Sequence, residues 1–387
     1  MTDRRFVYLD YHATTPVDPE VLDAMLPWFT ERFGNAASRQ YRLGWEALEA
    51  VESAREQVAA LIGADAKEIV FTSGATESNN LALKGLAEAC REKGSHFVTV
   101  VTEHKSVLDT LKRLEHDGYD VTYLPVANDG LVDLNRVREA VTTNTIALSV
   151  MAANNEIGVL AQLSDLAAIA HEKGALLHTD AVQAVGKVPF NVNKIGVDLA
   201  SLTAHKFYGP KGVGALYVRR RPRRVSVTPL LDGGGHERGM RSGTLNVPGI
   251  VGLGAAASMA AKVLTEESTR LKRLRDRLLK GLQARVPDLV VNGSMQARLP
   301  GNLNVSFPGV DGEALLVSLS DDLAVSSGAA CTAAEPSYVL KALGRKTELA
   351  LATLRFGLGR WTTEEDVNFA VARAGEVVTR LRAMSPV

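Results

Sequence analysis

The sequence predicts an α/β fold in which a mostly parallel sheet, covered by helices on both faces, is joined to a smaller α+β domain. Two observations predict it. From about residue 45 to residue 220, stretches of helical period alternate with short apolar runs, as in βαβ units. Beyond about residue 265 this alternation stops, and a long charged helix precedes short strands. The length of 387 residues suits about two domains of ordinary size.

The expected elements follow in order along the chain. The first amphipathic helix, residues 45–63, ends at Gly63. The strands expected after it are residues 68–73, 96–101, 120–126, 145–151, 175–180, 197–203 and 214–219, and the helices between them are residues 75–90, 105–118, 133–141 and 166–174. Residues 247–264 predict a core helix of small residues, and residues 268–286 predict a separate charged helix. The pattern Thr362-x-x-Glu365 indicates the start of a last helix.

These elements predict a division into two domains. We expect a large domain over residues 16–264 and a small α+β domain made of residues 1–15 and 265–387. The small domain would carry the segment 326–335, which contains one of the two cysteines.

Charge and composition exclude several classes of protein. Forty-four Lys and Arg residues balance 44 Asp and Glu residues, so no net field would attract nucleic acid or anionic lipid. The arginine-rich run at 218–225 is therefore interpreted as a solvated turn rather than an RNA site. No segment resembles a signal peptide or a bilayer span, and two cysteines cannot form a disulfide framework. We expect a cytoplasmic protein with neither a membrane nor a nucleic-acid partner.

Polar residues follow three of the expected strands, at the edge where sheets of this type bind ligands. The turn Ser73-Gly74-Ala75-Thr76 opens a helix whose free N–H groups and dipole can hold an anion. A second strand ends on Asp180, with Gln183 three residues later, and a third is followed by Lys206. Taken singly, each feature has a plain structural explanation, namely a helix cap, an N-cap carboxylate and a solvated lysine.

Together, the three features predict a site for pyridoxal 5′-phosphate (PLP). The turn would bind the phosphate, Asp180 would keep the pyridine nitrogen protonated, and Lys206 would bond the aldehyde. A lysine in such a cleft is desolvated, which lowers its pKa and frees the neutral amine. The protonated ring would then withdraw electrons from the substrate Cα and make a carbanion there accessible.

Motifs along nearly the whole chain resemble those of one enzyme family. They are YLDYHATTP, GNAASRQYRLG, EIVFTSGATESNN, TEHKSVLDT, NNEIG, HTDAVQAVGK, HKFYGPKGVGALYVRR, GGGHERGMRSGT, SSGAAC, EPSYVL and LRFGLGRWTTEED. This set resembles the cysteine desulfurases of the NifS/IscS type, which are class V aminotransferases with the PLP-dependent transferase fold type I. The resemblance implies a homodimer that converts L-cysteine to L-alanine, forms a persulfide on the enzyme and passes the sulfur to an acceptor protein, such as an iron–sulfur scaffold or a SufE-like protein.

The resemblance also implies roles for individual residues. The implied catalytic residues are Lys206 as the Schiff-base lysine, His104 as the stacking residue that shuttles protons, and Cys331 as the nucleophile. Arg355 would pair with the substrate carboxylate. The implied cofactor contacts are Ala75, Thr76, His104, Asn155, Asp180, Gln183, Thr203, His205 and Lys206, together with Thr244, which would reach the phosphate in the other subunit; Asn155 would also contact the substrate.

Cys331 lies in a stretch of small residues, Ser326 to Ala334, with nothing large to anchor it to a core. We expect this stretch to be mobile, so that the thiolate can reach the substrate sulfur and then carry it away. Cys90, on an expected helix, is interpreted as an inert core residue. Only three residues separate Cys331 from EPSYVL, fewer than the resemblance leads us to expect, which leaves the route of sulfur delivery open.

Several alternatives remain at this point. A selenocysteine lyase or another class V enzyme could share the scaffold, because fold alone does not fix function. A sulfur-carrier scaffold without catalytic activity is the alternative from another class, against which the pair Asp180 and Lys206 argues. The sequence predicts no resident metal, and it leaves open whether Cys331 ligates an iron–sulfur cluster in a complex.

Overall fold

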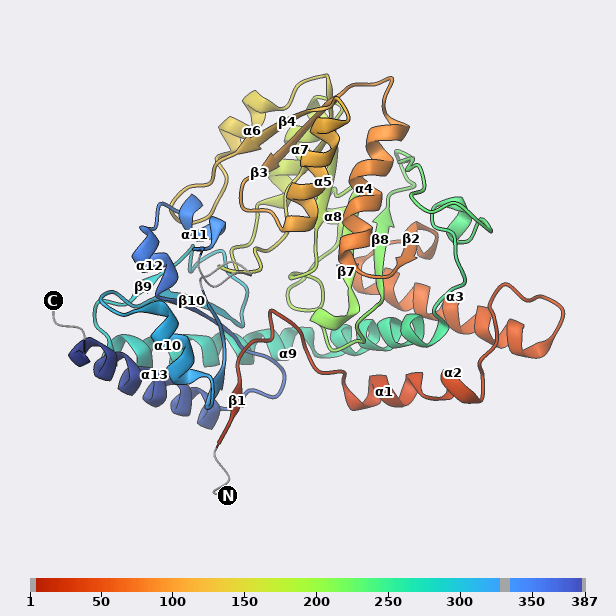
Figure 1. Ribbon diagram of the computed structural model, residues 1–387. Coiled ribbons are helices and arrows are strands. Elements are labelled where there is room, and N and C mark those ends of the chain that lie inside the picture. Colours follow the sequence, from red (N-terminus) through yellow and green to blue (C-terminus); the bar gives the residue numbers. More distant parts are fainter. Residues whose placement is uncertain (1–4, 328–334, 385–387) are drawn as a thin grey trace.

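A seven-stranded sheet forms the centre of the larger part of the molecule (Figure 1). The computed structural model describes residues 5–327 and 335–384. The strand order is β2 (Ile69–Thr72), β8 (Gly214–Val218), β7 (Leu199–Thr203), β6 (Leu176–Asp180), β5 (Thr145–Ser149), β3 (His96–Val100) and β4 (Asp120–Leu124). The five strands from β7 to β4 run parallel, which confirms the predicted mostly parallel sheet.

Strand β8 is antiparallel to both of its neighbours, β7 and β2. Only a short 3-10 turn, η2 (Ala204–Lys206), lies between β7 and β8, whereas a parallel connection would need a crossover. Because β2 pairs with the other side of β8, it runs in the same direction as β6 and β7. The carboxyl ends of β2, β6 and β7 therefore lie at one edge of the sheet.

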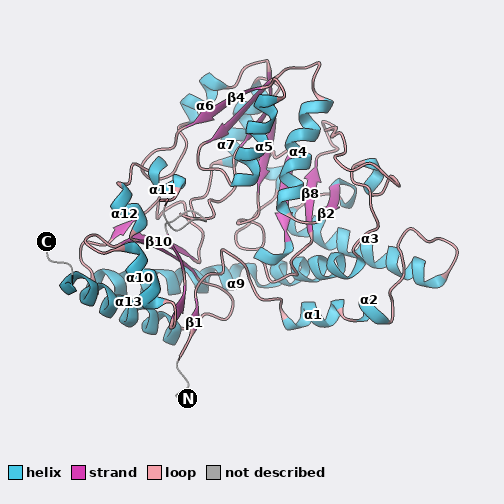
Figure 2. Ribbon diagram, in the orientation of Figure 1, coloured by secondary structure: helices cyan, strands magenta, loops and turns pink. Residues whose placement is uncertain are grey.

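Helices cover both faces of this sheet (Figure 2), and six of its seven strands are buried along their whole length. One face is packed by α4 (Ala75–Ala89) and α5 (Lys105–His116). The other face is packed by α3 (Arg42–Ile62), α6 (Leu134–Ala140), α7 (Leu163–Glu172), α8 (Val192–Ile195) and part of α9 (Val247–Arg285), with α1 (Pro19–Met25) and α2 (Pro27–Thr30) alongside. As predicted, the helix before β2 ends at Gly63, which adopts φ 69°.

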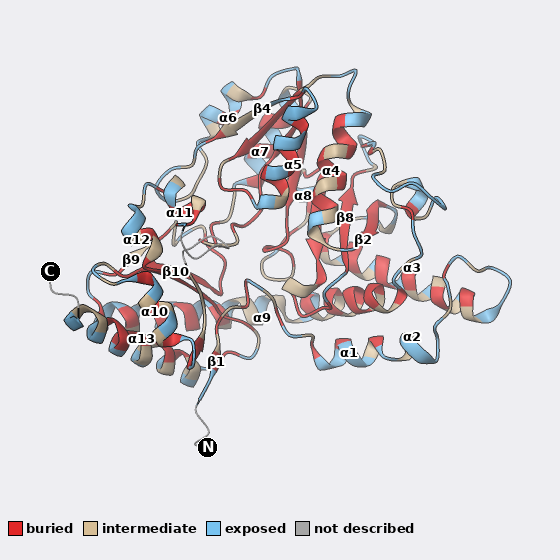
Figure 3. Ribbon diagram, in the orientation of Figure 1, coloured by how far each residue is buried: buried red, intermediate tan, exposed pale blue. Residues whose placement is uncertain are grey.

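A second, antiparallel sheet has its own hydrophobic core. Its order is β12 (Ser326–Ser327), β13 (Thr353–Gly357), β10 (Asn302–Ser306) and β9 (Val290–Val291), and β1 (Val7–Tyr8) pairs in parallel with β11 (Leu323–Ala324) beside it. Helices α10 (Gly312–Leu319) and α13 (Glu364–Met384) pack in this core. Helices α11 (Tyr338–Ala342) and α12 (Thr347–Leu351) pack in a smaller cluster with Ile157 and Val159. Figure 3 shows the two buried regions side by side.

Helix α9 joins the two cores, and here the sequence prediction of two separate helices was wrong. A single helix of 39 residues runs through the expected boundary at 264/265, because no proline, glycine or cap interrupts that stretch. Its first half packs in the core of the large sheet and its second half in that of the small sheet. By length and composition alone, part of α9 could cross a membrane, but half of that window is buried inside the protein.

The start of α13 also differs from the prediction. Thr363, not Thr362, accepts a hydrogen bond from the backbone N–H of Asp366 (3.1 Å), and the Asp366 carboxylate accepts one from the N–H of Thr363 (3.0 Å). Thr362 instead accepts a hydrogen bond from the N–H of Gly359 (3.0 Å). The capping box lies one residue further along because the chain still turns at residue 362.

Candidate active site

A cavity of about 520 Å³ opens at the edge where β2, β6 and β7 end. This volume is within the usual range for a small-molecule site. All of the predicted site residues except Thr244 and Cys331 line it, namely Ala75, Thr76, His104, Asn155, Asp180, Gln183, Thr203, His205, Lys206 and Arg355. Residues that were predicted from segments far apart in the sequence thus meet around one space.

The N-terminus of α4 forms one wall of the cavity. Gly74 precedes the helix with φ 152°, a conformation that favours glycine, and no side chain caps the first turn. A Cβ on Gly214 of the neighbouring strand would lie 2.7 Å from the Gly74 Cα, so glycine is required there too. The uncapped N–H groups at residues 75–76 and the helix dipole suit an anion at this wall.

Lys206 projects from η2 into the same cavity. Its Nζ donates hydrogen bonds to the carbonyl oxygens of His12 (2.7 Å) and Ala13 (2.6 Å). Burial, and after it the positive charge of Arg355, lower the pKa of Lys206 from its ordinary 10.5 to about 8. The amine is therefore neutral in a substantial fraction of molecules near physiological pH, as a nucleophilic lysine requires.

The carboxylate of Asp180 lies at the end of β6 and is buried. Its Oδ1 accepts from the backbone N–H of Val182 (3.1 Å), and its Oδ2 accepts from the side-chain amide of Asn79 (2.8 Å). Glu103 lies close enough that the charge of Asp180 adds to burial in raising the pKa of Glu103 well above its usual range. A protonated Glu103 places no second negative charge beside Asp180.

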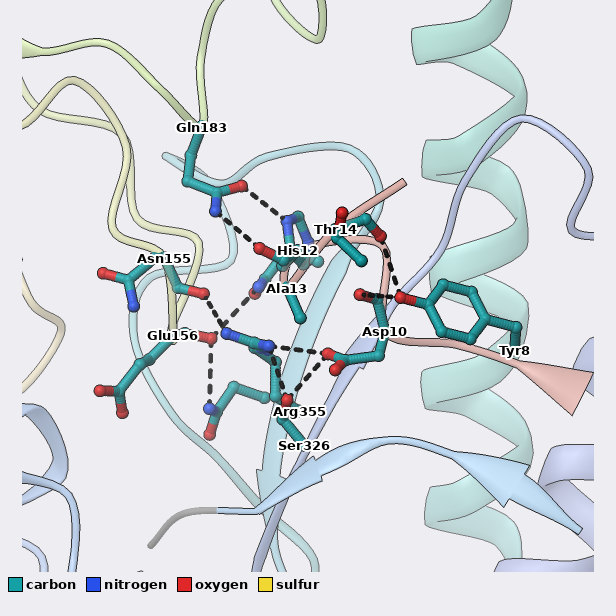
Figure 4. A network of polar contacts seen from close by, with 12 residues as sticks. Tyr8, Asp10, His12, Ala13, Thr14, Asn155, Glu156, Gln183, Ser326 and Arg355 are labelled. Atoms are coloured by element: carbon teal, nitrogen blue, oxygen red, sulfur yellow. Dashed lines mark hydrogen bonds and ion pairs between the residues drawn. The ribbon is translucent and has the colours of Figure 1, made fainter. Parts of the chain in front are cut away.

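Gln183 is held by the buried His12 and the half-buried Lys187. Its Oε1 accepts from Lys187 Nζ (2.7 Å). The same oxygen lies 3.1 Å from His12 Nδ1, and Gln183 Nε2 donates to the carbonyl of His12 (2.9 Å); Figure 4 draws these two contacts. Burial lowers the pKa of Lys187 and that of His12 far below their ordinary values. The orientation of the Gln183 amide is thereby fixed before any ligand arrives.

Arg355, on β13, faces the cavity from the second sheet. Its Nη2 donates to Asp10 Oδ1 (2.7 Å) and to Ser326 Oγ (2.6 Å), and its Nη1 donates to the carbonyl of Asn155 (2.8 Å) (Figure 4). Ser326 in turn donates to Asp10 (2.8 Å). The guanidinium is thus tied both to the N-terminal segment and to β12, where the predicted cysteine segment begins.

Cys331 lies outside the described residues. The segments on either side of residues 328–334 are both anchored at the cavity, by the bond from Arg355 to Ser326 on one side and by a bond from Ser337 to Glu156 on the other. Cys90 ends α4 and is half-buried, and burial raises the pKa of its thiol. Its thiolate is therefore disfavoured, which agrees with the interpretation of Cys90 as unreactive.

Thr244 does not line the cavity and is exposed. Its segment is attached to the first turn of α4 by an ion pair between Arg241 and Glu77 (2.8 Å). The predicted reach of Thr244 to another subunit is not tested by a single chain.

Three contributors to the site were missed by the sequence analysis. Asp10 and His12 belong to the motif YLDYHATTP, whose polar residues directly after an apolar run could have indicated them. Lys211 lines the cavity from the Gly-Pro-Lys-Gly turn, which was noted only as a turn.

Comparisons with known proteins identify the family. The sequence matches the model of the family described as aminotransferase class-V over residues 7–369. The chain belongs to the class V aminotransferase family. Within this family, cysteine desulfurase IscS of Anaeromyxobacter dehalogenans (strain 2CP-C) is 58% identical over 382 residues, which cover 98% of this chain and 94% of that protein.

Two solved structures are similar to this chain over nearly its whole length. A NifS-like protein is similar with a TM-score of 0.91 and 40% identity, covering 97% of this chain and 100% of that one. The structure described as SspA in complex with cysteine is similar with a TM-score of 0.81 and 38% identity, covering 92% of this chain and 99% of the other. The predicted resemblance to NifS/IscS-type enzymes and the predicted fold class are therefore confirmed.

Proposed function

We propose that this protein is a PLP-dependent cysteine desulfurase that converts L-cysteine to L-alanine and receives the sulfur on Cys331. The enzyme class is supported by a curated cysteine desulfurase that is 58% identical over nearly the whole chain. The observation that carries the proposal is the cavity itself, where a half-buried amine with a lowered pKa, a buried carboxylate and an open helix N-terminus converge.

The residues around the cavity fit PLP. Three lining residues have buried polar atoms that lack a hydrogen-bond partner within residues 5–327 and 335–384, namely His12 Nε2, Asn155 Oδ1 and Arg355 Nε. Such atoms cost free energy unless a ligand satisfies them. The N-terminus of α4 would hold the phosphate, Asp180 the pyridine nitrogen, and the amine of Lys206 the aldehyde carbon. When bound, PLP supplies an electron sink that makes a carbanion at the substrate Cα accessible.

The other residues act on the substrate. Arg355 would bind the carboxylate of cysteine with its guanidinium fork, which fixes the Cα–H bond relative to the cofactor. Lys206 would take the Cα proton as a neutral amine, which its lowered pKa allows. His104, at the cavity wall, would pass protons to or from the reacting groups.

The sulfur step balances without an external oxidant. The Cys331 thiolate attacks the sulfur of the substrate thiol, which keeps its hydrogen, and the Cβ–S bond breaks with its electron pair left on Cβ. A proton then goes to Cβ, and the proton that Lys206 removed returns to Cα, which completes L-alanine. The enzyme cysteine and the transferred sulfur form a persulfide, which a second thiol on an acceptor protein can take over. We propose a dedicated acceptor, an iron–sulfur scaffold or a SufE-like protein, as the partner.

The remaining predictions also stand as proposals. They are a homodimer in which Thr244 contacts the phosphate in the other subunit, a cytoplasmic location, and a division into domains at residues 15/16 and 264/265. The second sheet with its own core supports the division.

Covalent attachment of PLP to Lys206 tests the proposal. The purified protein, loaded with PLP, is treated with borohydride, digested and mapped by mass spectrometry. We expect the reduced cofactor on the peptide that contains Lys206 and on no peptide in a Lys206→Ala variant. Label on Lys187 or Lys211 instead, or no label in fully loaded protein, would contradict it. Turnover of L-cysteine against L-selenocysteine in the same preparation separates a desulfurase from a lyase.

A further inference from the structure

A chain of hydrogen bonds behind the cavity wall connects Asp180 to His104. Asn79, fully buried on α4, uses its amide nitrogen to donate to Asp180 Oδ2 (2.8 Å) and to Ser106 Oγ (2.8 Å). Ser106 Oγ lies 2.8 Å from His104 Nδ1, and the backbone N–H of Ser106 donates to the same nitrogen (3.2 Å). The chain thus runs from the end of β6 through α4 to the first turn of α5.

The chemistry of the groups fixes the direction of each bond. A carboxylate oxygen can only accept, so Asn79 must turn its NH₂ group toward Asp180; the flipped amide would place two acceptors 2.8 Å apart. The second amide hydrogen then goes to Ser106 Oγ, which accepts it. The single hydroxyl hydrogen of Ser106 is left to donate to His104 Nδ1.

Asn79 Oδ1 agrees with this orientation. It is buried and has no hydrogen-bond partner in the part of the chain that the structure describes. An unpaired buried amide oxygen costs free energy. The two hydrogen bonds that the amide nitrogen donates to Asp180 and Ser106 outweigh this cost and keep the amide in this orientation.

The same logic determines where the proton lies on His104. The backbone N–H of Ser106 can only donate, and the Ser106 hydroxyl donates as well, so Nδ1 accepts from both. A neutral imidazole that accepts at Nδ1 carries its hydrogen on Nε2. Because His104 lines the cavity, its Nε2–H group is the one available to a bound molecule.

We propose that Asn79 and Ser106 are positioning residues that hold neutral His104 in the Nε2–H tautomer. This inference deepens the proposed function, on which it rests for the role of His104. In this tautomer His104 first meets a molecule in the cavity as a hydrogen-bond donor through Nε2–H, and Nε2 can take a proton only after it has given that hydrogen up. The Asn79 amide thus orients both the Asp180 carboxylate and, through Ser106, the His104 imidazole. Neither side chain needs to reorient when substrate binds.

The tautomer can be measured directly in the holoenzyme. Ring-¹⁵N histidine is incorporated, the imidazole ¹⁵N shifts are recorded without substrate, and the His104 signals are assigned by their loss in His104→Gln. Free neutral imidazole already favours Nε2–H, so the comparison between variants carries the test. We expect Nε2–H to exceed Nδ1–H by about tenfold or more in the parent, which corresponds to about one net hydrogen bond.

Two substitutions act on the chain at different points. Ser106→Ala removes one of the two donors to Nδ1 and should lower the tautomer ratio several-fold, and Ser106→Thr should restore it. Asn79→Asp places a carboxyl oxygen beside Asp180, where the two buried carboxyl groups share one proton. The same oxygen accepts from the Ser106 hydroxyl, which turns away from His104, and the ratio falls again. Asn80→Asp is the matched control, because Asn80 lies on the same helix and its amide donates to the carbonyl of Thr76 (2.9 Å), its single side-chain bond within residues 5–327 and 335–384.

The outcomes separate this inference from the proposed function. A parent with Nδ1–H, or a tautomer ratio that Ser106→Ala leaves unchanged, would overturn it even if the enzyme releases sulfur from cysteine. An inactive protein with the expected tautomer would overturn the function and not the inference. If the ratio falls as expected, kcat for L-cysteine should fall with it while KM stays constant, because none of these residues contacts Arg355 in the structure.

Discussion

Replacing Arg355 by lysine should weaken turnover of L-cysteine while keeping the positive charge. The Arg355 guanidinium already donates to Asp10, Ser326 and the carbonyl of Asn155, and its Nε is buried without a partner in residues 5–327 and 335–384. A lysine ammonium has three donors and no fork, so it cannot keep these contacts and also hold both oxygens of a carboxylate.

The size of the effect follows from the bonds lost. One charge-assisted hydrogen bond to the substrate is worth about 1.5–3 kcal/mol, so kcat/KM should fall about 10- to 150-fold, mainly through KM. Steady-state alanine formation measures it. L-Cysteine methyl ester, which lacks the carboxylate charge, serves as control and should be converted equally poorly by Arg355→Lys and the parent. A kcat/KM for L-cysteine within about twofold of the parent, or an equal loss with the ester, would refute this role of the fork.

Three further predictions concern the cofactor and the fold. The rate at which the apoenzyme takes up PLP should rise with pH to a plateau above about 8 and fall about tenfold per pH unit below it. The reason is that only the neutral amine of Lys206 reacts, and the pKa of this amine is lowered to about 8. A midpoint of the rate–pH curve near 10.5, measured by stopped-flow absorbance, would contradict this prediction. Glu237→Gln should destabilise the protein by about 3 kcal/mol in thermal or urea unfolding. It removes the buried carboxylate of the Arg55 guanidinium, which is only 4% exposed, and leaves it only the half-exposed Glu52 as an ion-pair partner within the described residues. Glu364→Gln, which breaks exposed pairs, should cost less than about 1 kcal/mol. Equal losses in the two variants would show that burial does not determine the cost of breaking these ion pairs. Thr244→Val should weaken PLP binding about tenfold, because one hydrogen bond to the phosphate is lost, and should leave the oligomeric state unchanged. An unaltered affinity for PLP would exclude the proposed contact between Thr244 and the phosphate in the other subunit.

Sequence patterns predict the site well where function depends on position within a strand. Asp180 and Lys206 follow apolar runs, and parallel strands bring their carboxyl ends together, so periodicity alone places these residues near each other. The turn Ser73-Gly74-Ala75-Thr76 was predicted for the same reason, because β2 runs with β6 and β7.

Contacts made by the chain ends could not be predicted in this way. Asp10 and Arg355 are 345 residues apart, and their ion pair exists because the N-terminal segment lies beside β13. Helix α9 was divided in two because its composition changes from apolar to charged, although no residue breaks its backbone. The composition of a helix reflects its surroundings and not its ends. Because α9 passes from one hydrophobic core to another, its composition changes without a break in the helix.

The Asn79 chain was also invisible in the sequence. Ser106 is two residues from His104, but Asn79 joins them only because α4 and α5 pack against each other on the same face of the sheet. Such positioning contacts depend on tertiary packing, whereas the groups that they orient can be found from strand ends.

Sulfur on Cys331 is the most direct measure of the proposed activity. The PLP-loaded enzyme is mixed with L-cysteine, quenched under acid, alkylated and mapped by mass spectrometry, with Cys90→Ser and Cys331→Ser as matched variants. One additional sulfur atom should appear on the peptide containing Cys331, in the parent and in Cys90→Ser alike, with L-alanine formed in equal amount in the first turnover. Alanine formation at the parent rate by Cys331→Ser, or the extra sulfur on Cys90, would contradict the account.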